Sequence, residues 1–258
     1  MPFVLPQSIA RFIDGAPLTR DCVGESPCEV HAFERGNDRF FLKASAAIYA
    51  PTTYSVMREA SVLQWLDGKL QVPEVVACAA GEGHEFMITR AVPGRPLAEL
   101  MEDEPSVYQA FAEALRLLQA VPVDGCPFDS SAAVRLHELK YLVDQGLIAD
   151  DWDPDTWPEL PTPQALIAHL HASVPTEDRV FSHGDLCDAN LFIDARERLH
   201  FIDLGRGGLA DRWLDIAFAH RNIAEELSPA TADRFIARMG IPDQPARRLF
   251  FEQLDEMF

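Results

Sequence analysis

Hydrophobic and polar residues along the first 90 positions alternate in short runs that predict mainly β-strands. Two such runs, 30–33 and 40–44, flank a Gly-Asn-Asp turn and are typical of a β-hairpin. The segment 53–66 instead places apolar residues at helical spacing, so we expect one helix there. Two further strands are predicted around the Gly-rich turn at 81–83.

Beyond residue 90 the pattern becomes mainly helical. The predicted helices span 108–121, 133–146, 163–173, 211–227, 229–239 and 244–257. Two short strands, 191–194 and 199–203, are expected to form a second hairpin. The pattern therefore predicts an α+β, bilobal protein. A small β-rich N-terminal lobe spans residues 1–90, and a larger helical C-terminal lobe spans residues 91–258.

Charge is distributed unevenly between these predicted lobes. The chain has 22 Lys and Arg against 41 Asp and Glu, a net charge of −19. No Lys or Arg lies between Lys140 and Arg179, whereas eight Asp and Glu do. Such a field repels nucleic acid and anionic membranes and attracts a polycation. An acidic surface that serves only solubility is the alternative reading, but the concentration of charge in one part of the chain favours a cationic ligand.

Cysteine usage and hydropathy predict the compartment. Five scattered cysteines without a Cys-x-x-Cys pair suit reduced thiols better than disulfides or a zinc site. No apolar run approaches the roughly 20 residues needed to span a bilayer, and the N-terminus lacks the pattern of a secretory signal. We therefore expect a cytoplasmic protein.

The segment SHGDLCDAN at 182–190, followed by HFIDLG at 200–205, carries the most specific chemistry. Asp185 lies on a predicted loop, where a carboxylate can accept the proton of an alcohol that attacks a phosphate. Asn190 and Asp203 lie at the ends of the two hairpin strands, so their oxygens can meet around Mg²⁺. This order of residues is that of protein kinases, with Gly184 replacing the usual Arg and Leu204 the usual Phe.

The N-terminal region offers residues that suit a nucleotide. Lys43 ends a predicted strand and could reach the α- and β-phosphates, and Glu59 on the next helix could pair with it. The loop VGESPCEV at 23–30 has no Gly-x-Gly-x-x-Gly pattern, but the Ser26 hydroxyl and nearby N–H groups could hold phosphate oxygens.

Several long motifs together resemble one family. GESPCEV, FFLK, FSHGDLCDAN, FIDLGRGGLADRWLDIAF and the terminal LDEMF make the chain similar to the aminoglycoside 3′-phosphotransferases, or kanamycin kinases, over nearly its whole length. The resemblance implies a protein-kinase-like fold. It also implies an enzyme that moves the γ-phosphate of ATP to the 3′-hydroxyl of kanamycin-type aminoglycosides and confers antibiotic resistance.

The resemblance also implies roles for individual residues. Asp185 would be the catalytic residue, and Asn190 with Asp203 would bind magnesium. ATP would contact a group of six residues: Ser26, Phe41, Lys43, Glu59, Thr89 and Ala91. Phe41 would stack on adenine, Thr89 to Ala91 would supply backbone hydrogen bonds, and Ile88 would lie behind the base.

For the antibiotic, the resemblance implies an acidic loop, parts of a late helix region and the C-terminus. The implied residues are Asp150, Asp151, Asp153, Asp155, Arg206, Arg221, Glu225, Glu226, Asp255, Glu256 and Phe258. The acidic loop departs from the family by mixing Asp with Trp and Pro. Besides this cationic substrate, we expect no nucleic-acid or membrane partner, and a monomer or weak dimer.

Two alternatives remain open from the residues. One is a kinase of the same fold that acts on choline, homoserine or a macrolide, which would call for an aromatic cage or an apolar pocket. The other is a non-catalytic acidic binding module. The acidic cluster disfavours the first, and the presence of Asp185, Asn190, Asp203 and Lys43 disfavours the second.

Overall fold

The computed structural model divides into two compact units. It describes three stretches of the chain: 4–21, 26–148 and 156–258. The first unit comprises residues 1–97 with 189–207, and the second comprises 98–188 with 208–258. The second hairpin therefore belongs to the same unit as the N-terminal sheet, although about 90 residues of chain separate them. The functional division at residue 90 stays a prediction.

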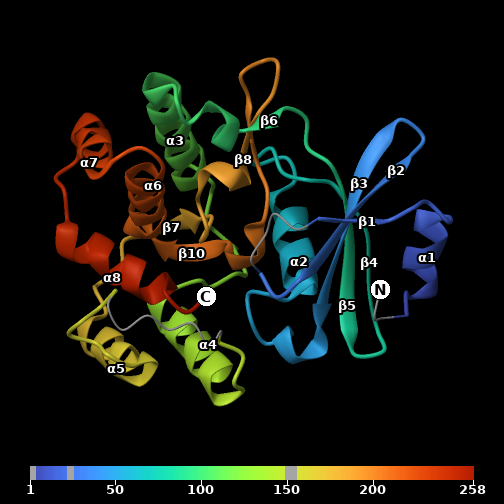
Figure 1. Ribbon diagram of the computed structural model, residues 1–258, viewed down its shortest axis with the longest axis horizontal. Helices are drawn as coiled ribbons and strands as arrows, with labels where there is room; N and C mark the ends of the chain where they lie inside the picture. The colour runs from blue at the N-terminus through green and yellow to red at the C-terminus, as the bar shows by residue number, and fades with distance from the viewer. Residues whose placement is uncertain (1–3, 22–25, 149–155) are drawn as a thin grey trace. The chain divides into compact units, whose positions relative to one another are not determined.

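Five strands of the first unit form one antiparallel sheet in the order β1-β2-β3-β5-β4 (Figure 1). The strands are β1 Thr19–Asp21, β2 Glu29–Arg35, β3 Asp38–Ala46, β4 Val75–Gly81 and β5 His84–Arg90. The first predicted hairpin is confirmed as β2–β3, in which Phe33 pairs with Phe40. Two helices, α1 Gln7–Ile13 and α2 Val56–Leu66, pack on this sheet.

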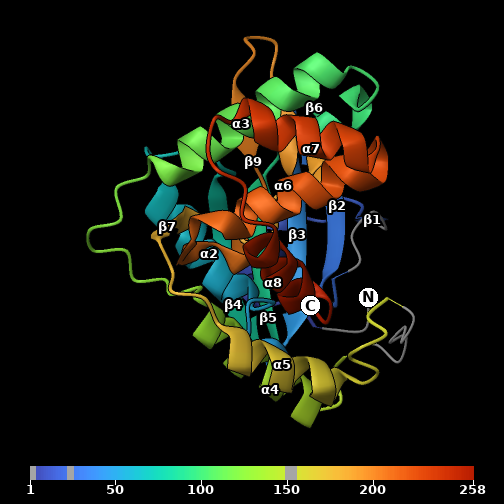
Figure 2. The ribbon, with the colours of Figure 1, turned by 90° about the vertical axis from the view of Figure 1, so that its left-hand side faces the viewer.

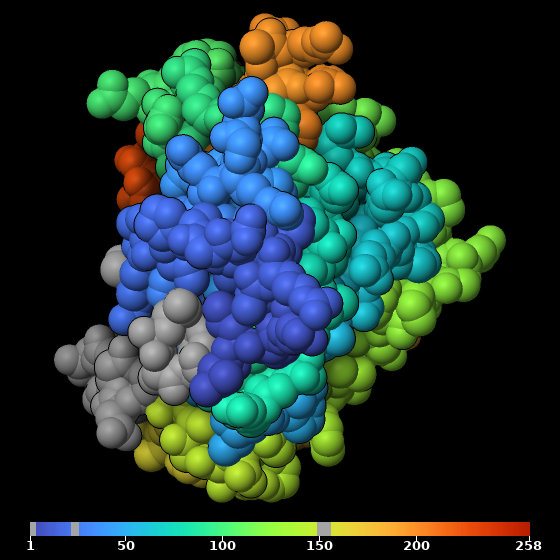
Figure 3. Space-filling model, turned by 90° about the vertical axis from the view of Figure 1, so that its right-hand side faces the viewer, coloured from blue at the N-terminus to red at the C-terminus, as the bar shows by residue number. Residues whose placement is uncertain are grey.

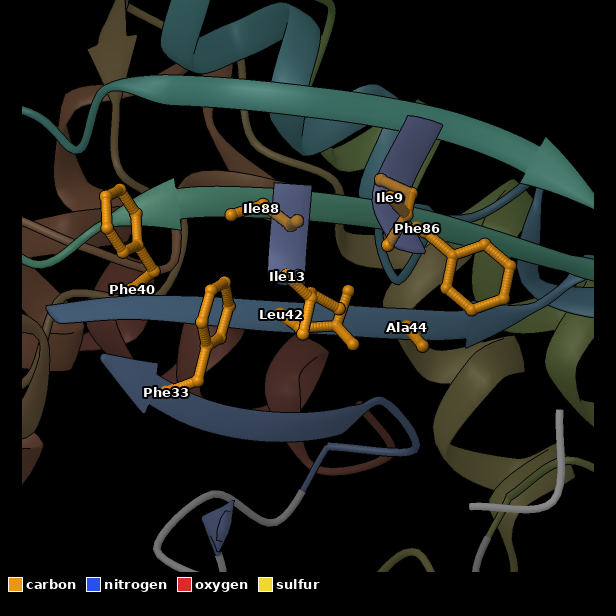
Figure 4. Packing of buried hydrophobic residues seen from close by; sticks show 8 residues of the cluster. All are labelled: Ile9, Ile13, Phe33, Phe40, Leu42, Ala44, Phe86 and Ile88. Carbon is orange, nitrogen blue, oxygen red and sulfur yellow. The ribbon is translucent and has the colours of Figure 1, made fainter. Parts of the chain in front are cut away.

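Side chains that alternate along β3 point to opposite faces of the sheet. Phe40, Leu42 and Ala44 join an apolar core on the face covered by α1, which contributes Ile9 and Ile13 (Figure 4). The intervening residues Phe41, Lys43 and Ser45 face α2, since the Ser45 hydroxyl accepts a hydrogen bond from the N–H of Val56, the first residue of that helix. One face of β3 thus builds the core, and the other presents polar groups.

Helix α2 begins at Val56, three residues later than the sequence pattern predicts. The side chain of Ser55 accepts a hydrogen bond from the N–H of Arg58 at 3.1 Å and so caps the helix. The Ser55 hydroxyl also donates to Glu85 of β5 at 2.7 Å. These contacts attach the first turn of α2 to the sheet.

The second predicted hairpin is confirmed as β8 Leu191–Ile193 and β9 Leu199–Phe201. It forms a three-stranded sheet with the short β6, Arg95–Pro96. The N–H of Ile202 donates to the carbonyl of Asn190 at 3.1 Å, which extends the pairing by one step. This contact places Asn190 beside the start of the segment that carries Asp203.

The second unit is mainly helical, as predicted. Its helices are α3 Glu104–Gln119, α4 Ala132–Asp144, α5 Pro163–Ser173, α6 Arg212–Glu226, α7 Pro229–Arg238 and α8 Pro245–Asp255. Helices α7 and α8 both pack against α6, whose central residues are almost completely buried (Figure 2). A two-stranded sheet of β7 Arg179–Ser182 and β10 Gly208–Asp211 packs against α3 and α6 at its β7 strand.

A hollow of about 550 Å³ lies beside α1, on the face of the first unit seen in Figure 3. Polar and apolar surface contribute about equally to its walls, and Arg20 and His31 are among the lining residues. His31 pairs with Leu42 across β2 and β3, so this hollow is on the side of the sheet opposite Lys43. Within the described stretches, no helix is long and apolar enough to cross a membrane.

Candidate active site

Lys43 joins two carboxylates in the first unit. Its Nζ lies 2.9 Å from Oε2 of Glu59 on α2, as predicted from the sequence. It also contacts Oδ1 of Asp203, which is 160 positions away in the chain. The side chains of Lys43 and Glu59 are 14 % and 6 % exposed, whereas that of Asp203 is 46 % exposed. Lys43 and Glu59 are therefore largely buried, whereas the carboxylate of Asp203 reaches solvent.

The positive charge of Lys43 and the negative charges of Glu59 and Asp203 stabilise one another. Burial opposes the charged form of Lys43, but Asp203 and Glu59 outweigh it and hold the pKa of the ammonium well above its usual value. Burial raises the pKa of Glu59, and the charge of Lys43 opposes that rise. Lys43 consequently remains a cation at neutral pH, which is the form that attracts phosphate oxygens.

Asp203 directly follows Ile202, whose N–H is bonded to the carbonyl of Asn190. Asp203 has the left-handed conformation, with φ 60° and ψ 48°, immediately after the β8–β9 pairing ends. A 3₁₀ helix, Leu204–Arg206, follows at once. A Cβ at Gly205 would lie 2.7 Å from the carbonyl oxygen of Thr53, so only glycine fits this close approach to the start of α2.

Phe41 and Thr89 share the face of the sheet that carries Lys43. They are directly paired across β3 and β5, and Lys43 pairs with Met87 two positions further on. Phe41 is half-buried, and Arg39 lies over its ring at 5.2 Å. An aromatic ring on the same face as Lys43 suits an adenine that extends from the phosphates, but the nucleotide contacts of Phe41 and Thr89 stay a prediction.

Two expectations about the adenine region need correction or refinement. Ile88, expected behind the base, lies instead in the core on the α1 face, because it pairs with Leu42. Met87 occupies the face of Lys43 in its place. The N–H of Ala91 donates to the carbonyl of Arg39 at 2.9 Å, so an adenine contact here would use the Ala91 carbonyl or break this bond.

Ser26 is exposed at the start of the described part of its loop. The neighbouring Cys28 donates through its thiol to the carbonyl of Tyr54 at 3.4 Å, which ties the loop to the segment before α2. Burial, together with Glu59 and Asp203, raises the pKa of Cys28 to about 11, although Lys43 and Ser26 oppose the rise. The thiol therefore stays protonated beside the lysine cluster.

In the second unit, the loop that carries Asp185 is held through its backbone. The N–H groups of His183 and Gly184 donate to the two oxygens of Asp215 on α6, at 2.8 and 2.9 Å. Gly184 has φ 82°, a conformation that favours glycine. The carbonyl of Gly184 accepts from Nη2 of Arg135 at 2.9 Å. Both peptide groups that flank Gly184 are thus fixed, and the partly exposed Asp185 follows directly.

Several residues expected to bind the antibiotic meet in the second unit. Nη2 of Arg221 on α6 lies 2.6 Å from Oδ2 of Asp255 on α8. Burial raises the pKa of Glu225, and Arg221 partly offsets this effect. Glu226 and Glu256 are exposed, and Phe258 is half-buried. Arg221 and Asp255 neutralise each other, which leaves the neighbouring carboxylates with an acidic excess.

Comparisons with known proteins agree with this arrangement. Residues 29–250 match the model of a phosphotransferase enzyme family. An aminoglycoside 3′-phosphotransferase of Acinetobacter baumannii is 40 % identical over 257 residues, which cover 98 % of this chain and 99 % of that protein. The chain belongs to the aminoglycoside 3′-phosphotransferase family. The family predicted from the sequence motifs is thereby confirmed.

Solved structures confirm the fold as well. The crystal structure of an aminoglycoside 3′-phosphotransferase of type VIII is similar, with a TM-score of 0.79 and 30 % identity, covering 95 % of this chain and 94 % of that one. A Streptomyces rimosus aminoglycoside phosphotransferase in complex with ADP and streptomycin has a TM-score of 0.73 and 24 % identity. That match covers 91 % of this chain and 94 % of the other. The predicted bilobal kinase-like fold class is therefore correct.

The remaining predicted residues fall into two groups. Asp150, Asp151, Asp153 and Asp155 lie outside the described residues, so their role stays a prediction. Arg206, expected to bind the antibiotic, belongs to the first unit, where its guanidinium donates to the Tyr54 hydroxyl at 3.3 Å and lies 5.6 Å from that ring. Its role as a substrate contact also stays a prediction.

Sequence reasoning missed three residues that organise these groups: Arg58, Arg135 and Asp215. Arg58 donates to the carbonyls of Gly205 and Gly207, at 3.0 Å for the latter. Asp215 and Arg135 are 3 % and 1 % exposed, and both lie on the apolar faces of helices. A charged residue at an apolar-face position was the signal available in the sequence, because such a residue must find a buried partner.

Proposed function

We propose that this protein transfers the γ-phosphate of ATP, bound with Mg²⁺, to the 3′-hydroxyl of kanamycin-type aminoglycosides and so confers resistance. The observation that carries the proposal is the contact of Lys43 with both Glu59 and Asp203. This cluster suits the binding of a triphosphate, and membership of the family supports an aminoglycoside as the acceptor. In this proposal the residues around Lys43 bind the phosphates, and those around Asp185 bind and direct the acceptor hydroxyl.

The residues fit a magnesium ion. Asp203 offers a carboxylate that is 46 % exposed, and Asn190 offers an amide, both hard oxygen donors on adjacent segments. Among the described residues, no three His, Cys, Asp or Glu side chains could hold a metal by themselves. This donor set therefore suits an ion that takes its other ligands from phosphates and water. When bound, Mg²⁺ would neutralise charge on the phosphates.

The protein's own groups would act by positioning and by charge. Lys43, kept cationic by its two carboxylates, would bind phosphate oxygens, and Glu59 would hold the lysine in place. Asp185 would accept a hydrogen bond from the acceptor hydroxyl and direct its oxygen towards the γ-phosphorus. Because Asp215 fixes the backbone before Asp185, the carboxylate would need little rearrangement.

The acidic residues of the second unit would bind the ammonium groups of the antibiotic. Each exposed ion pair contributes only about 1 kcal/mol or less, so recognition would rest on several together. Such binding tolerates related aminoglycosides and weakens as salt increases. A cytoplasmic location, where ATP is available, and a monomeric or weakly dimeric state without nucleic-acid partners complete the proposal.

The decisive experiment is a coupled assay of ADP release with kanamycin and with an analogue that lacks the 3′-hydroxyl. We expect turnover of kanamycin only. Equal turnover of both would overturn the 3′ assignment, and turnover of choline, homoserine or a macrolide alone would favour the rival kinases. No turnover of any of these alcohols would favour the acidic binding module.

Asp185→Asn tests the role of the proposed base. The variant should fold and bind ATP like the wild type, because the backbone bonds to Asp215 do not involve the Asp185 side chain. Its turnover should fall by roughly 100-fold or more, since a general base contributes about 10²–10⁴-fold. Retention of wild-type turnover would show that another group directs the hydroxyl.

A further inference from the structure

Arg135 on α4 is one of the largest fully buried side chains of the second unit, with an exposed fraction of 1 %. Burial of a guanidinium is costly unless hydrogen bonds and favourable electrostatic contacts surround it. The other buried residues of this helix are mainly apolar, including Leu136, Leu139 and Leu142, although Glu138 is buried as well. A long cation at this position therefore calls for a role beyond packing.

One end of this side chain contacts the catalytic loop. Nη2 of Arg135 donates to the carbonyl of Gly184 at 2.9 Å. That carbonyl belongs to the peptide group that leads directly into Asp185. Asp215 holds the preceding N–H groups from the other direction. Orientation of the Asp185 backbone consequently depends on two buried charged side chains of opposite sign.

The same guanidinium contacts the C-terminal residue of the chain. Its central carbon lies 5.2 Å from the ring centroid of Phe258 and 5.9 Å from that of Phe218. Arg221 lies 5.0 Å from the ring of Phe218 and is itself paired with Asp255. A cation within about 6 Å of an aromatic ring is attracted by its electrons. These contacts place Arg135 next to the two rings that border the proposed antibiotic-binding carboxylates.

We propose that Arg135 is a positioning residue that couples the C-terminus to the catalytic loop. The ring of Phe258 already lies over the guanidinium, and an aminoglycoside that engages the C-terminal region would hold it there. The guanidinium in turn holds the Gly184 carbonyl and thereby the direction of Asp185. This inference rests on the proposed function, and it adds a path by which acceptor binding improves the alignment of the catalytic residue.

Phe258→Leu is the sharpest test, because it removes the ring and keeps an apolar side chain at this position. The C-terminal residue is half-buried, so the exchange should not prevent folding. We expect kcat with kanamycin to fall by about 5-fold, the effect of losing one cation–π contact. The KM for ATP should stay unchanged. An unchanged kcat would overturn the inference.

A double-mutant cycle with Arg135→Lys separates coupling from general stability. Lysine keeps the charge but loses the planar group that contacts both rings and the carbonyl. Arg135→Lys should lower kcat on its own, and adding Phe258→Leu should then lower it little further. Additive effects of the two exchanges would overturn the inference. If Arg135→Lys does not fold, the single Phe258→Leu result decides.

Arg248→Lys is the matched control. Arg248 is also largely buried in the second unit, but its side chain contacts Asp243 and His220 rather than the carbonyl of Gly184. The Arg248→Lys exchange should lower the melting temperature without lowering kcat at 25 °C. If Arg248→Lys also loses kcat, in the same proportion to its fall in melting temperature as Arg135→Lys, the loss reflects stability and the inference is overturned. Absence of wild-type turnover would overturn the proposed function itself, whereas wild-type turnover with an insensitive Phe258→Leu would overturn the coupling alone.

Discussion

Arg58 and Glu59 are consecutive residues of α2, and their side chains hold two different parts of one cluster. Glu59 binds Nζ of Lys43 on β3 at 2.9 Å. Arg58 donates to the carbonyls of Gly205 and Gly207, directly after Asp203. A single turn of helix therefore determines both where the lysine lies and where the following loop presents its carboxylate.

The position of Arg58 predicts a specific defect in nucleotide handling. Arg58→Lys removes the planar guanidinium that donates to two carbonyls at once, so the loop after Asp203 should lose its fixed position. We expect a rise of about 10-fold in the KM for ATP and a higher magnesium requirement, corresponding to the loss of roughly one charge-assisted hydrogen bond. Steady-state kinetics at varied magnesium measure both quantities.

Ser61→Ala is the control for Arg58→Lys, since Ser61 is exposed on the same helix and donates only to the carbonyl of Met57. It should leave the KM for ATP unchanged. A wild-type KM for ATP and magnesium requirement in Arg58→Lys would show that other contacts hold the loop.

Lys43 and Glu59 should differ in how strongly their loss affects turnover. Lys43→Met removes the cation that we propose contacts phosphate and should lower kcat/KM for ATP by roughly 100-fold or more. Glu59→Gln keeps the shape and should lower it by about 10-fold, because the lysine is still held by Asp203. ADP-release kinetics with varied ATP measure the ratio. Equal losses would contradict a direct role for lysine and an indirect role for glutamate.

The environment of Glu225 predicts how antibiotic binding depends on pH. Burial, Glu226, Glu252 and Asp255 all raise its pKa, and Arg221 opposes them. A carboxylate with a raised pKa becomes neutral at a higher pH than an ordinary glutamate, whose pKa is about 4.3. Its attraction for an ammonium group is therefore present above the raised pKa and is lost as the pH falls through it.

Kanamycin affinity, measured by calorimetry from about pH 7 downward, should consequently begin to weaken at a higher pH than the titration of ordinary glutamates alone would give. Glu225→Gln should bind less tightly at pH 7 and show a flatter dependence over this range. Parallel pH profiles of the variant and the wild type would indicate that Glu225 lies on the surface without binding the antibiotic.

Cys28 should resist alkylation. The thiolate is the reactive form, and a pKa of about 11 leaves very little of it at pH 8. Cys78 is exposed and should react first with iodoacetamide. Mass spectrometry after short labelling distinguishes the two sites, and the urea-unfolded chain, in which both should react, is the control. Labelling of Cys28 as fast as Cys78 would contradict the burial of the thiol.

The sequence pattern predicted some elements well and missed others for identifiable reasons. The β2–β3 hairpin and the helix α2 have clear periodicity and a turn, and both are present. Helix α1 has only seven residues, too few to stand alone, and depends on the burial of Ile9 and Ile13 against the sheet. The short strands β7 and β10 likewise depend on pairing with each other.

Sequence alone predicted which side chains would do the chemistry of this protein, because phosphate transfer requires particular residue types in a particular order. Asp185, Asn190, Asp203 and Lys43 could be named on that basis. Only tertiary structure decided which groups hold them. Lys43 meets Asp203 across 160 positions, and Asp215 turns inward to the loop before Asp185. Such contacts depend on the packing of distant elements and on the need of buried charges for partners, and local periodicity records neither.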